Sequence, residues 1–545
     1  MPYAASIGSG SNVLIQGIGF AGGYHTTLRI GHVDNLTLDG VRAIATAGNS
    51  TVSDQDIVTI TGTSEASKVQ GLIVRNSEIG MGLGEDNSGL SLSHVEGASI
   101  TLNEFADLTG AAIRLRDSTV ATTVDRNKFI MVDEFIRPET GSATTHHDGL
   151  RARNNVFRQR TSYVKQGGIG PGNPTGYALK NTAGEGKNYS NFRYVNNTFI
   201  LDDGAVLDLV TTGSHSLGDK SFTFKNNLVI LQQRVSETEA QREPAIWVRD
   251  TASASAVDMD YNVYWFGDDH QVFDIVGAGR VSGQGNYRAA WSGYGNEQNS
   301  LVVPAATSVM QVDGKGIGGA QASFPFPVDV TGPVIGAADV SDPDYPDDDF
   351  MGIARTANTV GAYEWRADAY EFGLTSILDA GREKVGFSFN PVANFDVWDA
   401  DNNATGRDDF QFSHWDIANP SDFLVGISYP NVPFTGPVQR AVITFHVWKE
   451  YIPGEGLIRA QLPPCSQYTV NTYLPSKQRM SEEYQRVILA RGRKEIDVTG
   501  MVNEALSHPS WTPGRLNFII EAWSSGVDVN LSAENSRTVR LLLVP

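Results

Sequence analysis

The chain has 545 residues, enough for two or three domains with sizeable buried cores. Its 42 basic and 62 acidic residues give a formal net charge of −20, which disfavours nucleic acids and anionic membrane surfaces as partners. The single cysteine excludes an intrachain disulfide, and no apolar run of about 18 residues predicts a membrane span. No basic stretch followed by an apolar stretch predicts a signal peptide at the N-terminus.

One short pattern recurs along the first half of the chain: an asparagine followed two residues later by a large apolar residue. An earlier relative is Asn76-Ser77-Glu78-Ile79, and the clearest copies are Asn103-Glu104-Phe105, Asn127-Lys128-Phe129, Asn155-Val156-Phe157, Asn197-Thr198-Phe199, Asn227-Leu228-Val229 and Asn262-Val263-Tyr264. The asparagines are first 27, 24 and 28 residues apart, and later 42, 30 and 35. Spacings that lengthen in this way indicate coils of a solenoid into which loops are inserted.

The chemistry of this pattern predicts a parallel β-helix. Asparagine tolerates the left-handed backbone that a tight corner needs, and stacked asparagine amides can bond to one another from coil to coil. The residue two positions later points inward and fills the core. Short alternating strands at 36–38, 91–93 and 113–115 lie between these steps.

The segment 146–153 is the richest in groups that could do chemistry. Strand alternation places His146 and Asp148 on the outer face, and the insertion 163–189 after them is locally basic within an acidic protein. We expect an anionic sugar to bind here, near groups that can transfer protons. The candidate catalytic residues are His146, His147, Asp148 and Arg151, and the candidate substrate-binding residues are Arg153, Lys165, Tyr177 and Lys180. The structural alternative is that His147 and Asp148 satisfy a coil corner and that the insertion contacts another subunit.

Metal sites have weaker support in the sequence. The aspartates at 344 and 347–349 could bind a structural calcium ion, but they lack an EF-hand frame. The ten histidines are scattered, so no zinc site is predicted. We therefore expect no cofactor and no catalytic metal, with structural calcium as an alternative.

After a cluster of proline and aspartate at 341–349, the residue pattern of the sequence changes. We expect a β-helix over 1–367, a linker with a short helix over 368–383, and a β-sandwich over 384–545. Strands at 441–448 and 516–520 support the sandwich, and Asn503-Glu504-Ala505-Leu506 continues a short helix. The fold class is therefore all-β, a parallel β-helix followed by a sandwich.

Several motifs resemble those of the right-handed parallel β-helix superfamily, which includes pectate-lyase-like enzymes and phage tail-spike proteins. They are His146-His147-Asp148-Gly149, Tyr261-Asn262-Val263-Tyr264, and Phe350 to Arg355 followed by Gly361-Ala362-Tyr363-Glu364. Further on, Asp497-Val498-Thr499 and Trp511 resemble jelly-roll modules that accompany glycan-directed proteins. The resemblance implies a protein that contacts polysaccharide at a virion surface or outside the cell.

Three functions are compatible with this resemblance. The first is a virion-associated tail-spike or fibre-like protein, a homotrimer, that binds host surface polysaccharide, with or without degrading it. The second is a secreted bacterial polysaccharide lyase or glycoside hydrolase with an appended carbohydrate-binding module. The third is a non-enzymatic adhesive spike that uses the β-helix as a rigid rod. The sequence gives a narrow preference to the first.

Overall fold

The computed structural model describes most of the chain. The described residues are 3–22, 26–45, 56–82, 87–139, 146–159, 179–180, 188–201, 206–209, 222–231, 244–266, 273–303, 332–364, 370–373, 380–384, 388–391, 409–411, 423–450, 454–466, 475, 478–489, 492–522, 527–530 and 540–544. They fall into two compact units, one within 1–310 and 326–365 and the other within 366–545.

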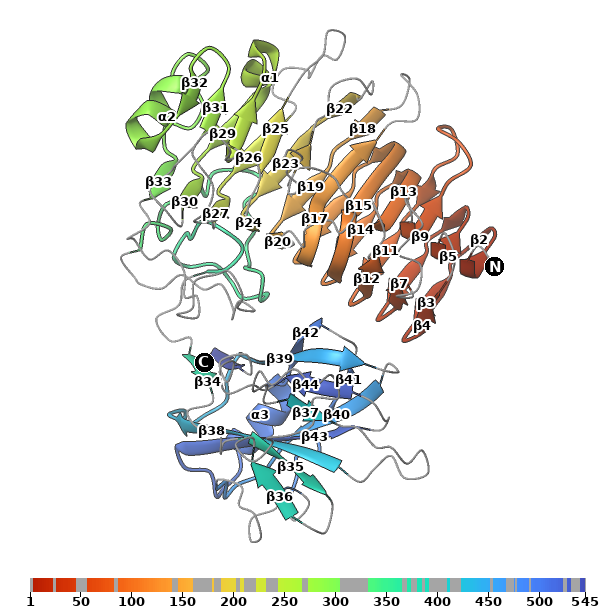
Figure 1. Cartoon of the computed structure of the whole chain (residues 1–545), viewed down its shortest axis with the longest axis vertical. Helices are drawn as coiled ribbons and strands as arrows, with labels where there is room; N and C mark the ends of the chain where they lie inside the picture. Colours follow the sequence, from red (N-terminus) through yellow and green to blue (C-terminus); the bar gives the residue numbers. More distant parts are fainter. Residues whose placement is uncertain are drawn as a thin grey trace, which may run out of the picture. The chain divides into compact units, whose positions relative to one another are not determined.

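Short strands stacked in parallel along one axis make up the first unit, as Figure 1 shows. One sheet contains nine strands, all in parallel register with their neighbours. In the order of the chain these are β3 (Leu14–Gln16), β7 (Thr37–Asp39), β11 (Ile73–Arg75), β14 (Ser99–Thr101), β16 (Thr123–Asp125), β19 (Arg151–Arg153), β23 (Phe192–Val195), β26 (Phe222–Lys225) and β29 (Val257–Asp260).

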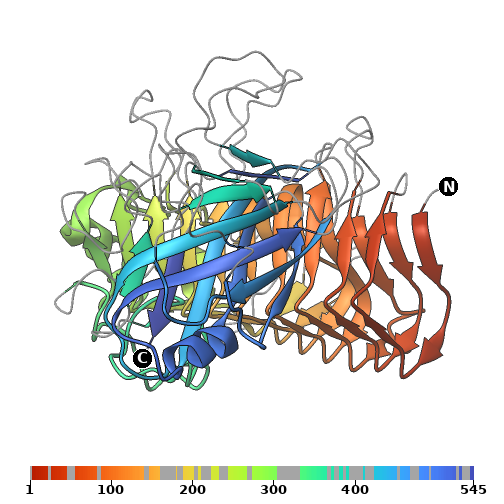
Figure 2. The same cartoon turned by 90° about the horizontal axis from the view of Figure 1, so that it is seen from below.

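A second sheet of 17 strands bends round the other sides of the unit. Its members are β1 (Tyr3–Ile7), β4 (Gly19–Ala21), β5 (Thr26–Ile30), β8 (Arg42–Ile44), β9 (Asp56–Thr61), β10 (Val69–Gln70), β12 (Glu78–Gly82), β13 (Ser88–Glu96), β15 (Glu104–Val120), β17 (Lys128–Glu139), β18 (His146–Asp148), β20 (Val156–Gln159), β22 (Asn188–Ser190), β24 (Thr198–Leu201), β27 (Leu228–Leu231), β30 (Val263–Phe266) and β33 (Leu301–Val303). Figure 2 shows the successive coils side by side. Because the chain returns to the nine-stranded sheet once in each coil and passes through the 17-stranded sheet in between, the unit is a parallel β-helix, and the predicted all-β fold is confirmed.

A smaller sheet continues one side of the β-helix beyond β17, since its first strand contacts β17. It consists of β21 (Leu179–Lys180), β25 (Leu207–Leu209), β28 (Ile246–Val248), β31 (Phe273–Ile275) and β32 (Gly279–Val281). Its strands are parallel except for the pair β31 and β32. The side formed by β9, β13, β15 and β17 therefore extends along the solenoid through β21, β25 and β28.

The recurring asparagines form a continuous hydrogen-bonded ladder inside one corner. Asn103, for example, donates its backbone N–H to Asn127 Oδ1 at 2.9 Å, and Asn127 does the same to Asn155 Oδ1 at 2.9 Å. Each amide nitrogen also donates to a backbone carbonyl of the preceding coil, as Asn103 Nδ2 does to Val74 O at 2.8 Å. The ladder continues through Asn197, Asn227 and Asn262. The predicted ladder is therefore present.

One detail of the prediction is wrong. The left-handed residue at this corner precedes the ladder asparagine: Arg126 has φ 54°, and Asn154 has φ 54°. Asn76 is also left-handed, with φ 52°, and the ladder position of its coil is Ser77, whose backbone N–H donates to Asn103 Oδ1 at 3.0 Å. Asn76 therefore occupies the left-handed position, one residue before the ladder position that the repeat predicted for it. The two positions are hard to tell apart in this coil because both hold polar residues.

The inward residues of the repeat form the core as predicted. Phe105, Phe129 and Phe157 are fully buried, and the rings of Phe105 and Phe129 stack with centroids 5.0 Å apart. Phe135 adds an edge-to-face contact with Phe129 at 4.4 Å. Stacked aromatic rings of this kind bury a large apolar area in successive coils and stabilise the solenoid along its length.

A closing segment, residues 339–364, returns along the asparagine corner of the first unit. The left-handed asparagines of the corner bind it: Asn154 Nδ2 donates to Asp348 O at 2.9 Å, and Asn226 Nδ2 donates to Asp339 O at 3.0 Å. Within the segment, Arg355 is almost fully buried and donates to Glu364 Oε2 at 3.3 Å and to Asn154 Oδ1 at 2.8 Å. Arg355 and Glu364, two residues of the motif that resembles the end of a β-helix, therefore form a buried ion pair within this segment.

The second unit contains two antiparallel six-stranded sheets. One consists of β34 (Tyr370–Gly373), β37 (Asp409–Gln411), β39 (Arg440–Glu450), β42 (Gly492–Asp497), β44 (Val527–Asn530) and β45 (Arg540–Val544), and the other of β35 (Ala380–Lys384), β36 (Ser388–Pro391), β38 (Phe423–Val432), β40 (Gly454–Ala460), β41 (Gln485–Leu489) and β43 (Gly514–Ala522). Strands of both sheets and the helix α3 (Thr499–Leu506) contribute to one hydrophobic core. The jelly-roll strand order stays a prediction.

The helix expected in the linker 368–383 is wrong for the residues that the structure describes there. Tyr370–Gly373 is strand β34 and pairs with β45, and Ala380–Lys384 is strand β35 and pairs with β38. Tyr370 and Phe372 alternate with Glu371 and Gly373, which suits a strand at the edge of a sheet. Pairing with a neighbouring strand outweighs the local helical preference.

Candidate functional site

The structure encloses His147 completely, so its ring cannot touch a polymer. Its Nδ1 accepts the backbone N–H of Thr119 at 3.2 Å and lies 2.9 Å from Thr119 Oγ1, while Nε2 lies 2.9 Å from the carbonyl of Glu139. Since Nδ1 is an acceptor, the proton is on Nε2, which donates to Glu139 O. The predicted catalytic role is wrong for His147, because the corner uses both ring nitrogens to connect β15 with the end of β17.

Asp148 also serves the corner. Its Oδ1 accepts from Ser190 Oγ at 2.5 Å and from Asn191 Nδ2 at 2.8 Å, both on the next coil. The following residue, Gly149, has φ 72° and supplies the left-handed turn. His146 lies in β18, and its side chain is outside the described part of the chain.

Arg151 and Arg153 lie beyond that turn, on β19 of the nine-stranded sheet, whereas His146 and Asp148 lie on β18 of the 17-stranded sheet. Arg151 Nε is 3.5 Å from Asp344 Oδ1 in the closing segment. The sequence-predicted catalytic group is therefore divided between two sheets, because Gly149 turns the chain between them.

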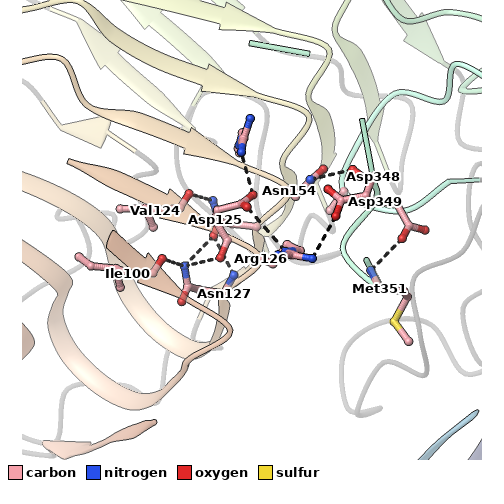
Figure 3. Close-up of polar contacts among 12 residues, drawn as sticks. Ile100, Val124, Asp125, Arg126, Asn127, Asn154, Asp348, Asp349 and Met351 are labelled. Atoms are coloured by element: carbon pink, nitrogen blue, oxygen red, sulfur yellow. Dashed lines mark hydrogen bonds and ion pairs between the residues drawn. The ribbon is translucent and has the colours of Figure 1, made fainter. Parts of the chain in front are cut away.

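Polar residues of the corner, Arg126 and Asn154 among them, hold the closing segment in place, as Figure 3 shows. Arg126 lies between Asp125 and Asp348, with Nη1 donating to Asp348 Oδ2 at 3.1 Å, and Arg153 Nε is 3.5 Å from Asp125 Oδ1. Burial raises the pKa of Asp125, while Arg153 and Arg126 act in the opposite direction. The carboxylate of Asp349 caps a tight turn by accepting the backbone N–H of Met351 at 2.9 Å.

The remaining predicted residues lie in the insertion. Lys165 and Tyr177 are outside the described residues. Lys180 lies in β21, where its backbone is in register with Asp208 of β25. Its strand therefore belongs to the side of the β-helix that begins with β9, β13, β15 and β17.

That side carries a cluster of ion pairs that was not predicted from the sequence. We call it the acid–arginine cluster: Asp56, Arg114, Arg116, Glu134, Arg137 and Glu139. The strand register places Arg114 of β15 beside Arg137 of β17, and Arg116 beside Glu139. The neighbours of Arg114 on the strand, Ile113 and Leu115, are fully buried in the core, so alternation directs the arginine outward.

Two arginines each bridge the same two carboxylates. Arg114 lies 3.4 Å from Asp56 Oδ1 through Nη1 and 3.4 Å from Glu139 Oε1 through Nε. Arg116 lies 3.5 Å from Asp56 Oδ2 and 3.5 Å from Glu139 Oε2. Arg137 donates to Glu139 Oε1 at 3.3 Å and also pairs with Glu134. The cluster is thus a closed ring of opposite charges with a further arginine on one side.

The cluster has a covered half and an open half. The side chains of Arg114 and Asp56 are only 1% and 7% exposed, whereas those of Arg116 and Glu139 are 38% and 26% exposed. Burial raises the pKa of Asp56, although Arg114 and Arg116 oppose this rise. Two carboxylates in unlike environments are one of the requirements of acid–base chemistry on a sugar.

A signal for this cluster was present in the sequence. Arg114 and Arg116 stand on either side of a core leucine, and Glu139 follows Arg116 by 23 residues, close to the 24 that separate Asn103 from Asn127. A coil repeat of this length places Arg116 and Glu139 on adjacent strands. Asp56 lies 58 residues before Arg114. Because the intervening coils differ in length, this separation does not show in the sequence that the two residues lie close together.

The described residues provide no further support for a metal. No three of their histidine, cysteine, aspartate or glutamate side chains converge as a metal site. Asp344 and Asp348 form ion pairs with arginines of the β-helix, so two of the four predicted calcium ligands have other partners. Structural calcium stays an untested prediction. Among the described residues, no helix has the length and apolar character needed to cross a membrane.

Comparison with known proteins identifies no family. No protein-family model and no curated protein matches the chain. Among solved structures, the enzymatically active domain of tailspike protein 4 from bacteriophage CBA120 is similar with a TM-score of 0.20 and 9% identity. The match covers 97% of this chain and 64% of that one, so the chain spans less than two thirds of the length of its neighbour. A TM-score of this size carries no argument about function.

Proposed function

We propose that the protein binds an anionic polysaccharide across the strands of the acid–arginine cluster and hydrolyses it there. The observation that carries the proposal is the pair formed by Arg116 and Glu139, which is open to solvent while the covered Asp56 and Arg114 fix its position. In keeping with the sequence, the protein would act at a virion surface or outside the cell, as a tail-spike-like homotrimer. The second unit would be a glycan-binding jelly roll.

The regular strands suit an extended polymer. Neighbouring strands are about 4.8 Å apart, so equivalent side chains on β9, β13, β15 and β17 form a straight row. The register places Thr61, Ser93, Arg116 and Glu139 in one such row. A guanidinium binds carboxylates and sulfates in a bidentate manner, and neighbouring hydroxyls can bond to sugar hydroxyls. Thr61, Arg116 and Glu139 are accessible to a chain that lies across the strands, whereas Ser93 is buried.

The chemistry of the cluster favours hydrolysis over elimination. Among the described members of the cluster, the titratable groups are carboxylates, and arginine is too basic to serve as a proton acceptor. Glu139, the more exposed of the two carboxylates, suits the base or nucleophile, and Asp56, whose pKa is raised by burial, suits the proton donor. The raised pKa keeps a proton on Asp56 to a higher pH than usual.

The test is a screen of homogalacturonan, alginate, bacterial capsular polysaccharide and lipopolysaccharide for binding and for products. New reducing ends without ultraviolet absorbance from unsaturated sugars would support hydrolysis, and unsaturated products would replace it with elimination. We expect Glu139→Gln to lower product formation at least about 100-fold while binding persists. Arg116→Ala should weaken binding about tenfold.

The matched control is Arg75→Ala, which removes a half-exposed arginine that pairs with Asp39 on the nine-stranded sheet. This variant should bind and cut like the wild type. If Glu139→Gln, shown to be folded by its thermal transition, produced the same products at the same rate, the cluster would be a structural ion-pair network and the third, adhesive function would gain weight.

A further inference from the structure

We infer that Trp247 forms a second sugar-binding position on the same side of the β-helix as the acid–arginine cluster, where it stacks against a pyranose ring. This inference rests on the proposed function and adds a specific subsite to it. It would make recognition depend on the length of the glycan, because only a long oligosaccharide reaches both places.

The strand β28 presents Trp247 outward. Its neighbours Ile246 and Val248 are buried in the core, so alternation places the indole on the outer face, where it is half-buried. The guanidinium of Arg249 lies over the indole with its carbon 3.5 Å from the ring centroid. A stacked guanidinium orients the ring and places a positive charge beside it, which suits an acidic sugar.

The strands on both sides place aspartates in register with the tryptophan. Asp208 of β25 pairs with Trp247 on one side, and Asp274 of β31 pairs with it on the other. The side chain of Asp274 is half-buried and can accept hydrogen bonds from sugar hydroxyls. A flat apolar ring beside a carboxylate and a guanidinium matches the two surfaces of a pyranose, its apolar C–H face and its hydroxyl edge.

The distance to the cluster suits a single oligosaccharide. The path from β17 to β28 passes through β21 and β25, so three strand spacings of about 4.8 Å separate them, roughly 14 Å in all. Lys180, predicted from the sequence to bind substrate, lies on β21 within this path. One acidic glycan lying across the strands would therefore pass from Glu139 over β21 to Trp247.

The experiment compares wild type, Trp247→Ala, Trp247→Phe and Asp274→Asn in titrations with galacturonate and alginate oligosaccharides of increasing length. We expect Trp247→Ala to weaken the binding of long oligosaccharides about tenfold and to leave that of the shortest unchanged. Trp247→Phe should keep most of the affinity, and Asp274→Asn should lose part of it. Trp265→Ala is the matched control, since Trp265 is a half-buried tryptophan on β30 of another sheet.

The outcomes separate the subsite from the proposed function. If Trp247→Ala and Asp274→Asn bound long oligosaccharides as tightly as the wild type while Arg116→Ala lost affinity, the subsite would be refuted and the proposed function would stand. If Trp247→Ala weakened short and long oligosaccharides equally, a general loss of structure would explain the effect, and the subsite would be refuted as well. Wild-type protein that bound none of these probes would overturn both proposals.

Discussion

Adjacent asparagines have different tasks in this β-helix. Both residues of such a pair are fully buried: the second, such as Asn155, belongs to the ladder, whereas the first, such as Asn154, has a left-handed backbone and binds the closing segment. One amide therefore bonds to neighbouring coils and the other to a segment about 200 residues away in the sequence. The pair Asn-Asn thus joins coil to coil and coil to closing segment at the same corner.

Asn155→Ala should destabilise the first unit by about 3–5 kcal/mol. The change removes the acceptor of the Asn127 backbone N–H and the donor to Val124 O, and it leaves both groups buried without partners. Urea unfolding followed by circular dichroism measures the difference. Asn286→Ala is the control, because Asn286 is exposed in the helix α2 (Gly283–Trp291) and should change stability by less than about 0.5 kcal/mol. Equal losses for the two variants would contradict a ladder that stabilises the fold.

Glu297 ends the ladder and makes stability depend on pH. It is fully buried, and its Oε1 accepts from Asn262 Nδ2 at 3.0 Å and from Tyr264 Oη at 3.1 Å. Burial raises the pKa of Glu297 from 4.5 to about 7, so the native state keeps a proton that the unfolded state has lost. The contribution of Glu297 to the free energy of unfolding is complete below a pH of about 4.5. It declines as the pH rises through about 7, by about 3 kcal/mol in total.

Glu297→Gln tests this dependence. The amide keeps a neutral side chain at every pH, so the variant should gain about 3 kcal/mol relative to the wild type between pH 4.5 and 8. Urea titrations at several pH values measure the gain. Asp258→Asn is a control, because Asp258 is partly exposed and pairs with Lys225 at 3.0 Å. A constant stability difference between Glu297→Gln and wild type across this range would show that the carboxyl does not titrate there.

At the scale of elements, ion pairs as well as hydrogen bonds hold the closing segment on the coils. Asp342 accepts from Arg193 Nη2 at 2.8 and 3.0 Å and lies 3.9 Å from Lys225 Nζ, while its own Oδ1 caps Asp344 N at 2.8 Å. The segment also bonds to the coils through Gly361 N, which donates to Asn226 O at 2.9 Å. Charge pairs of low exposure are costly to break singly, because the remaining partner stays buried without compensation.

Asp342→Ala should therefore loosen the segment and leave the coils folded. The loss should be about 2–4 kcal/mol in local stability, read as faster hydrogen exchange at the amides of Gly361 and Ala362, with little change in the amides of the ladder. Asp347→Ala is the control, since Asp347 is an exposed aspartate of the same segment. Equal exchange rates in both variants would show that the ion pairs of Asp342 do not fasten the segment.

The elements differ in how far the sequence reveals them. The ladder and the phenylalanine stack recur at short intervals, so a pattern search finds them. The acid–arginine cluster depends on the register between β9, β13 and β15, and the length of each coil sets that register. A strand pattern does not show that His147 is buried, or that Gly149 turns the chain between Asp148 and Arg151. A side chain that points outward on a strand is therefore weaker evidence of a functional site than side chains that lie close together on adjacent coils.

At the scale of the whole molecule, two units with separate hydrophobic cores predict two separate unfolding transitions. Phe129 is fully buried in the first core, and Phe518 is fully buried in the second, where it contacts Tyr429 edge-to-face at 5.9 Å. Each phenylalanine belongs to one core, so its truncation to alanine should cost about 3–5 kcal/mol in that unit. The position of the substitution along the chain should therefore decide which transition moves.

Calorimetry of Phe129→Ala and Phe518→Ala separates the two units. Phe129→Ala should lower the midpoint of one transition by several degrees, Phe518→Ala should lower the other, and neither should move both. Phe129→Leu, which nearly preserves the volume, should give a smaller shift of the same transition. If either alanine variant moved both transitions together, the units would be thermodynamically coupled, and glycan binding by one would then stabilise the other, because a ligand that binds only the native state raises its stability.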